Sequence, residues 1–190
     1  SHQAQDLYNL KLRIIEQNLY GADIDQFAVN IAMLRLWLSL AIEYDGPVPQ
    51  PLPNLDFKIV CGDSLLGPDP SPENFGDLFR NRIHQLAGQL AALKDRHMRA
   101  TGQEKTNLTK DIEGLRAQLR EALAESAAPA GAVDWRVEFA EVFDQNGGFD
   151  IAIANPPYGV PILGMYSEGV GSVNSYAAFL LLATELYVTS

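Results

Sequence analysis

Three short apolar runs in this chain each end directly in a polar residue, and this arrangement restricts the fold more than any other feature of the sequence. Runs of this length and composition are typical of strands, and helical patterns lie between them. Strands that alternate with helices predict a parallel sheet with helical crossovers, in which the carboxyl ends of the strands meet at one edge. We therefore expect the three polar residues to lie close together. The runs and the residues that follow them are Leu19–Ala22 with Asp23, Phe57–Cys61 with Gly62-Asp63-Ser64, and Phe149–Ala154 with Asn155.

Helical periodicity occupies much of the remaining chain. Leu7–Gln17 has the pattern of an amphipathic helix, and a second helix, capped by Asp25, is predicted to run to about Ile42. The apolar stripe of this second helix is so wide that we expect it to be packed on at least two sides. A last helix is predicted between Tyr176 and Tyr187.

The stretch from about Asn74 to Ser126 has a different character. Apolar residues recur there at alternating steps of four and three on either side of the polar Thr101-Gly102-Gln103. This spacing predicts an antiparallel helical hairpin inserted into the domain. We interpret it as a solvated structural arm, with a contact for DNA or another domain as the alternative. After the hairpin, Trp135–Phe143 alternates partly between apolar and polar residues and is bounded by a turn at Gln145–Gly148.

Composition restricts the setting of the protein. With 190 residues, of which 47% are hydrophobic, the chain can bury one sizeable core. Cys61 is the single cysteine, and the three histidines do not have zinc-ligand spacing, so we expect no metal. We find no apolar run of the roughly 18 residues that span a bilayer and no secretory signal, which predicts a cytoplasmic protein without a membrane segment. The net charge of −10 argues against this piece as the main grip on a polyanion.

Several motifs, taken in their order along the chain, resemble one enzyme family. They are Asn18–Asp25, Leu34–Leu40, Gly62-Asp63, Trp135–Phe139, and Gly148-Phe149-Asp150 ahead of Asn155-Pro156-Pro157-Tyr158. They are similar to class I, Rossmann-like S-adenosylmethionine-dependent DNA adenine-N6 methyltransferases of the fused type II restriction-modification and phage-defence group. The resemblance touches nearly the whole chain. It implies an α/β fold, a partial Rossmann-like methyltransferase with a parallel sheet and an inserted helical hairpin. The divisions would be 1–73 on the cofactor side, 74–128 for the hairpin and 129–190 for the catalytic-loop part.

The same resemblance implies a cofactor site for S-adenosylmethionine. Asp23, with Ile24 beside it, would accept hydrogen bonds from the ribose hydroxyls. Asp63 would accept from the adenine amino group, with the Ser64 backbone beside it, and Asn155 would complete the site. Each acid also has a purely structural interpretation, because Asp23 can belong to a helix start and Asp63 to a simple turn.

The resemblance assigns catalysis to Asn155, Pro156, Pro157 and Tyr158. An aromatic amine is a poor nucleophile, and acceptors aimed at its hydrogens favour the transition state. The Asn155 side chain and the Pro156 carbonyl would be those acceptors. The prolines would hold them in place, and Tyr158 would stack on an adenine flipped out of double-stranded DNA. A rigid extended linker is the structural alternative.

Other functions remain open at this point. The tetrapeptide also serves methylation of protein glutamine and of rRNA amino groups in the wider class, whereas cytosine-N4 enzymes more often carry Ser-Pro-Pro. A non-enzymatic interaction module acting through the hairpin is a further alternative. The family's glycine-rich loop ahead of Leu7 and the strands after Tyr187 are missing. We therefore expect a fragment that binds S-adenosylmethionine weakly, exposes apolar surface and self-associates, with a basic domain elsewhere in the parent protein.

Overall fold

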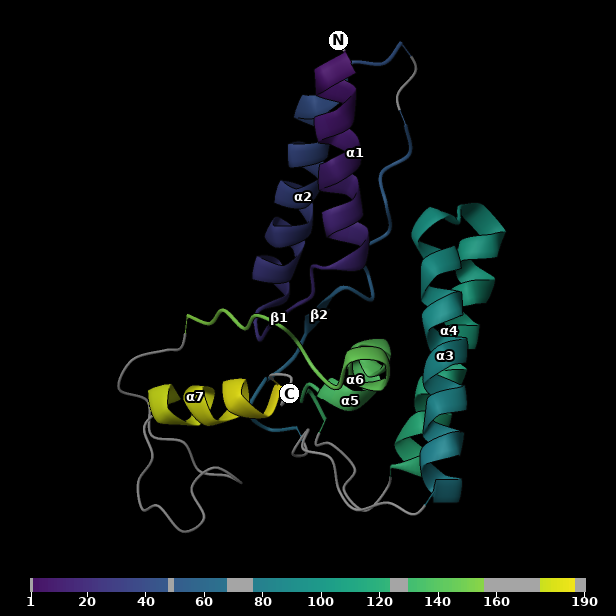
Figure 1. Ribbon diagram of the computed structural model, residues 1–190, viewed down its shortest axis with the longest axis vertical. Coiled ribbons are helices and arrows are strands. Elements are labelled where there is room, and N and C mark those ends of the chain that lie inside the picture. Colours follow the sequence, from purple (N-terminus) through teal and green to yellow (C-terminus); the bar gives the residue numbers. More distant parts are fainter. Residues whose placement is uncertain (1, 48–49, 68–76, 124–129, 156–174, 187–190) are drawn as a thin grey trace.

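The computed structural model describes residues 2–47, 50–67, 77–123, 130–155 and 175–186, and helices dominate these segments (Figure 1). Two long helices, α1 and α2, lie side by side, and α3 and α4 form an antiparallel pair. The helices are α1 His2–Gln17, α2 Gln26–Glu43, α3 Asp77–Arg99, α4 Gly102–Ala122, α5 Trp135–Glu138, α6 Ala140–Asn146 and α7 Ser175–Leu186; the strands are β1 Gly21–Asp23 and β2 Ile59–Cys61.

The two strands pair in parallel, with Gly21 opposite Ile59 and Asp23 opposite Cys61. Helix α2 is the crossover between them, as parallel pairing requires. A parallel bridge between Asp63 and Ala132 continues the pairing just beyond β2. The predicted third strand is not present as such, because residues 151–155 are extended but belong to no strand of the described chain, and Ile153 is exposed. The Rossmann-like fold therefore stays a prediction.

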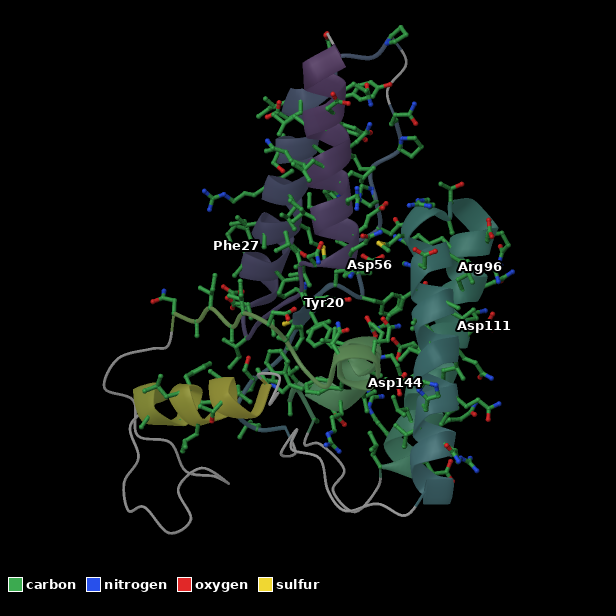
Figure 2. All side chains as sticks on the ribbon, viewed as in Figure 1. Tyr20, Phe27, Asp56, Arg96, Asp111 and Asp144 are labelled. Carbon is green, nitrogen blue, oxygen red and sulfur yellow. The ribbon has the colours of Figure 1, made fainter. Side chains whose placement is uncertain are left out.

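Helix α2 begins as predicted but is packed differently. The side chain of Asp25 caps it by accepting a hydrogen bond from the backbone N of Phe27 at 2.8 Å. Only one face is buried, through Val29, Met33 and Leu40, in a core cluster shared with α1. The predicted packing on two sides is wrong for the described chain, since Phe27 is 69% exposed and points away from α1 (Figure 2). The rest of this exposed stripe is Ile31, Leu34, Leu38 and Ile42.

The composition of α2 also corrects an expectation about membranes. By length and hydropathy alone, this 18-residue helix is apolar enough to cross a bilayer, although no such stretch was expected. Its role as the crossover between two directly paired strands accounts for the apolar character, because such helices cover a sheet face. Self-association through the exposed stripe stays a prediction.

The helical hairpin is part of the core rather than a solvated arm. Leucines and isoleucines of its seam form one cluster with Phe57 and with Val137 and Ala140 of α5 and α6. The turn between α3 and α4 is held as well. Asn54 donates from Nδ2 to the carbonyl oxygens of His97 at 2.7 Å and Ala100 at 2.9 Å. The seam residues buried in this cluster are Leu86, Ala87, Leu90, Ile112 and Leu119.

Buried ion pairs reinforce this attachment. The ammonium of Lys94 on α3 lies 2.9 Å from the carboxylate of Glu141 on α6 and also donates to the carbonyl oxygen of Glu138. The Glu138 carboxylate in turn contacts Arg116 and Arg120 of α4. Burial lowers the pKa of Lys94, and the neighbouring Glu141 carboxylate opposes that shift. The hairpin is thus joined to α5 and α6 by ion pairs, most of whose charged groups are buried.

The segment from Trp135 to Asn146 is helical, so its partial alternation was misleading. Asp134 caps α5 by accepting from the backbone N of Val137 at 3.3 Å, and α6 follows after a break at Phe139. The predicted turn is present: α6 ends at Gly147, whose φ of 77° lies in the left-handed region that favours glycine.

We predict that removal of Glu141 alone destabilises the fold more than removal of both Lys94 and Glu141. Glu141→Ala leaves the Lys94 ammonium buried without its counter-ion, which should lower the free energy of unfolding by about 3–5 kcal/mol. The double variant Lys94→Met, Glu141→Leu should recover most of this loss. The control is Glu104→Ala, which breaks an exposed pair with Arg96 at 3.6 Å and should change little. Denaturant titration measures all three, and a double variant as unstable as Glu141→Ala would contradict the interpretation.

Lys58 gives a prediction about pH. Its ammonium is buried 3.7 Å from the ring centre of Tyr20, and burial lowers the pKa of Lys58 from 10.5 to about 8. Between these values the unfolded chain binds more protons than the folded one, so the free energy of unfolding should rise with pH in that range. Lys58→Met should lack this contribution. Denaturant titrations of both proteins from pH 7 to pH 10 measure it, and parallel curves would contradict it.

Candidate functional site

One cavity of about 750 Å³ brings the sequence-predicted residues together. Its walls come from the end of β1, the turn after β2 and the extended segment before residue 156. Trp135, Phe149 and one side of α7 complete the lining. In Figure 1 these segments surround the region between β1 and α7. Each of the predicted cofactor residues lines this cavity: Asp23, Ile24, Asp63, Ser64 and Asn155.

Asp23 lies at the carboxyl end of β1. One of its carboxylate oxygens accepts a hydrogen bond from the backbone N of Asp25 at 2.8 Å, so the residue does help to start α2. Its backbone carbonyl accepts from the N of Gly62 at 2.9 Å, which holds the ends of β1 and β2 in register. Within the described residues no hydrogen bond occupies the second carboxylate oxygen. The structural and the ligand-binding interpretations of Asp23 are therefore compatible.

Asp63 lies in a turn that is fixed on both sides. Its carboxylate accepts from the backbone N of Leu65 at 2.8 Å. Its own backbone N donates to the Gly131 carbonyl at 2.8 Å, and its carbonyl accepts from the N of Val133 at 2.9 Å. The structural interpretation of Gly-Asp-Ser as a simple turn is therefore confirmed, because the Asp63 side chain closes the turn. The same bonds leave Asp63 on the cavity wall with a second oxygen that forms no hydrogen bond within the described chain.

Asn155 is exposed at the end of the extended segment and lines the same cavity. The segment begins at Phe149, whose backbone N donates to the carbonyl oxygen of Leu186 at 2.7 Å and so ties it to the end of α7. Pro156, Pro157 and Tyr158 lie outside the described residues. The roles assigned to the tetrapeptide remain predictions.

A cluster of aromatic rings supports the cavity, and it was not anticipated from the sequence. Tyr20, Trp135 and Phe149 line the cavity, and each packs on Phe139 with ring centres 5.3–5.9 Å apart. Burial raises the pKa of Tyr20, which keeps its hydroxyl protonated. The available signal was the spacing of Trp135, Phe139 and Phe143, which recur every four residues as on one helix face.

The charges that line the cavity are of one sign. Asp23 and Asp63 contribute carboxylates, and none of the described lining residues is a lysine, arginine or histidine. Such a site favours hydroxyl and amino donors and positively charged ligands, and it disfavours phosphate groups, which the carboxylates would repel. Among the described residues no group of three His, Cys, Asp or Glu side chains is arranged to hold a metal ion.

Comparison with known proteins adds a family to this geometry. The sequence profile described as "Eco57I restriction-modification methylase" matches residues 17–187. The chain belongs to the Eco57I restriction-modification methylase family. The part matched by the Eco57I family includes every residue that lines the cavity, from Tyr20 to Leu186.

A curated relative carries an activity in its name. It is a putative type II restriction enzyme and methyltransferase of Methanocaldococcus jannaschii, which is 48% identical to this Eco57I-family chain over 71 residues. The match covers 34% of this chain and 6% of the relative, so the chain spans a small part of that protein's length. No solved structure matches the chain.

We predict that the contact between the turn after β2 and the segment 131–133 tolerates no extra atom at Gly67. A Cβ there would lie 2.0 Å from the carbonyl oxygen of Val133. Gly67→Ala should therefore lower the free energy of unfolding by about 1–3 kcal/mol. The matched control is Gly88→Ala within α3, where nothing lies within 4 Å, and it should raise stability by about 0.5–1 kcal/mol. Equal effects in denaturant titration would show that the contact is not tight.

Proposed function

We propose that this chain supplies part of an S-adenosylmethionine-dependent DNA methyltransferase of a restriction-modification system, and that its target is the N6 amino group of adenine. The observation that carries the proposal is the single cavity in which Asp23, Asp63 and Asn155 meet at the ends of three separate segments. Membership of the Eco57I family and the name of the Methanocaldococcus jannaschii relative support DNA methylation within such a system. Adenine as the target rests on the resemblance of the Asn155–Tyr158 tetrapeptide.

The cavity fits the proposed cofactor in size and in charge. Its volume of about 750 Å³ lies within the range of small-molecule and cofactor sites. Asp23 can accept from a ribose diol and Asp63 from an adenine amino group, each through its second oxygen, while Ile24 offers apolar contact. The absence of basic residues from the described lining suits a cofactor without phosphate groups and argues against nucleotides that carry them. When bound, S-adenosylmethionine would supply an electrophilic methyl group on its sulfonium.

Asn155 is proposed to act on the acceptor. Its amide oxygen accepts a hydrogen bond from the target amino group, which keeps the nitrogen lone pair available and favours the tetrahedral nitrogen of the transition state. The tie between Phe149 and Leu186 fixes the start of the segment that ends at Asn155. In this proposal the Asn155 acceptor is held in place before the base arrives, which would lower the barrier by preorganisation.

A flipped base from double-stranded DNA is the proposed acceptor. The net charge of −10 means that the DNA backbone is held mainly by other parts of the protein, while this chain provides the pocket for one extruded base. The helical hairpin does not favour the alternative of an interaction module. Its seam is buried against α5 and α6, and its turn is bonded to Asn54, so both the seam and the turn serve the internal structure.

The proposal predicts a separation of binding from chemistry in the full-length protein. Asn155→Ala should reduce the methylation rate about a hundredfold or more, because a transition-state hydrogen bond is lost, while S-adenosylmethionine binding, for which Asn155 is one of several proposed contacts, falls much less. Asp23→Ala should mainly weaken binding of the cofactor. The matched control is Asn107→Ala on the exposed side of α4, which should leave both unchanged. Transfer of a labelled methyl group and calorimetry measure the two quantities.

The chemical identity of the product decides between the alternatives. Mass spectrometry of nucleosides from methylated DNA should show N6-methyladenine. Label in N4-methylcytosine would overturn the adenine assignment, and label in protein glutamine or in rRNA would overturn the DNA assignment. Full methylation by Asn155→Ala would remove the catalytic role of the tetrapeptide.

A further inference from the structure

We propose that Trp135 is a ligand-binding residue, and that its indole ring stacks on the adenine base of S-adenosylmethionine, whose amino group donates a hydrogen bond to Asp63. No role for Trp135 follows from the predicted site residues, and the inference rests on the proposed S-adenosylmethionine site. The ligand part concerned is a flat purine, for which an indole ring is a suitable partner.

The first support is the way in which Trp135 is held. Its Nε1 donates a hydrogen bond to the carbonyl oxygen of Ser64 at 3.2 Å. Ser64 follows Asp63, and the backbone of Asp63 is itself bonded to Gly131 and Val133 at 2.8 and 2.9 Å. Three hydrogen bonds therefore fix the Asp63–Ser64 turn against the single short segment that ends in Trp135. The carboxylate and the ring cannot move far relative to each other.

The second support is the location of the ring. Trp135 is half-buried and lines the cavity together with Asp63, Ser64 and Leu65. It also packs on Phe139 with ring centres 5.5 Å apart and on Phe149 at 6.3 Å. The anchored NH and these neighbours limit the rotamers of the side chain, so little entropy is lost when a ligand is bound.

The third support is chemical fit. A purine with an exocyclic amino group needs an acceptor at its edge and an apolar surface on its face. Asp63 offers the acceptor and Trp135 the surface, from two segments 72 positions apart that the bridge at Ala132 joins. An indole anchored by its NH needs no hydrogen bond from the ligand. The part of the ring that lines the cavity can therefore contact the base.

Calorimetry with the full-length protein tests the proposal by a graded series. Trp135→Ala should weaken S-adenosylmethionine binding about tenfold or more, because stacking on an aromatic side chain is lost. Trp135→Phe keeps a ring and should stay within about threefold of the unchanged protein. Methylthioadenosine, which has the base and ribose without the amino-acid part, should lose affinity in Trp135→Ala by a similar factor.

The control for loss of packing is Phe143→Ala. Phe143 belongs to the same aromatic cluster, at 5.9 Å from Phe149, but it does not line the cavity. Its removal should leave the affinity nearly unchanged. Equal losses in Phe143→Ala and Trp135→Ala, or no loss in Trp135→Ala, would overturn the stacking role.

A spectroscopic measurement separates contact from packing. The change in tryptophan emission on adding S-adenosylmethionine should be smaller in Trp135→Phe than in the unchanged protein. It should keep its size in Trp37→Phe, because Trp37 on α2 donates a hydrogen bond to the carbonyl oxygen of Pro53 and does not line the cavity. An emission change in Trp135→Phe as large as in the unchanged protein would overturn the inference while leaving the proposed function intact. Failure of the unchanged full-length protein to bind S-adenosylmethionine would instead overturn the proposed function itself.

Discussion

The backbone bridge between Asp63 and Ala132 joins the two parts of the chain that the helical hairpin separates in sequence. Parallel bridges of this kind bring together strand ends that lie far apart along the chain, and their closure has an entropic cost that grows with the intervening length. Here the intervening residues are not a passive loop. Many of them fold into α3 and α4, and the turn of this hairpin is bonded to Asn54. These contacts shorten the length of unconstrained chain between the two bridged residues. The bridge and the hydrogen bond from Trp135 Nε1 to the carbonyl oxygen of Ser64 together hold Asp63 and Trp135 on the same cavity wall.

The hairpin stabilises this closure with two kinds of interaction that act differently. Its apolar seam contributes free energy by burial against Phe57 and Val137. The ion pairs around Lys94 and Glu138 contribute less to net stability, because most of their charged groups are desolvated, but removal of one partner leaves a buried charge unpaired. Since α5 begins with Trp135 and α6 is followed by Phe149, the register of the hairpin also determines where two cavity walls lie.

The sequence predicted those features that depend on local chemistry. Asp25 as a helix cap, the hairpin turn near Thr101 and the turn at Gly147 each require particular residues at one position, and each is found. The convergence of Asp23 and Asp63 followed from a general property of parallel strands, whereas Asn155 lines the same cavity although its segment forms no strand in the described chain. The predictions that failed concern contacts with residues distant in sequence. The amphipathic stripe of α2 cannot show whether its second side is covered, and residues 151–155 form a strand only when another backbone pairs with them. Trp135 was missed because an apolar ring carries no chemical signature until its neighbours are known.

The cavity lining and the chain as a whole both carry net negative charge, and this charge limits how a nucleotide could approach. Carboxylates that line a site make it selective for ligands rich in donors, but they also repel the phosphates that flank any nucleotide in DNA. A base can enter such a site only if its phosphates stay outside, at positions where other parts of the protein neutralise them. Extrusion of a single base satisfies this condition, because the base leaves the stack while its backbone remains at the surface. In the proposed function, the same repulsion would keep a DNA strand out of the proposed S-adenosylmethionine site. The acidic cavity therefore fits the proposal that this chain binds S-adenosylmethionine and one extruded base, while other parts of the protein bind the DNA backbone.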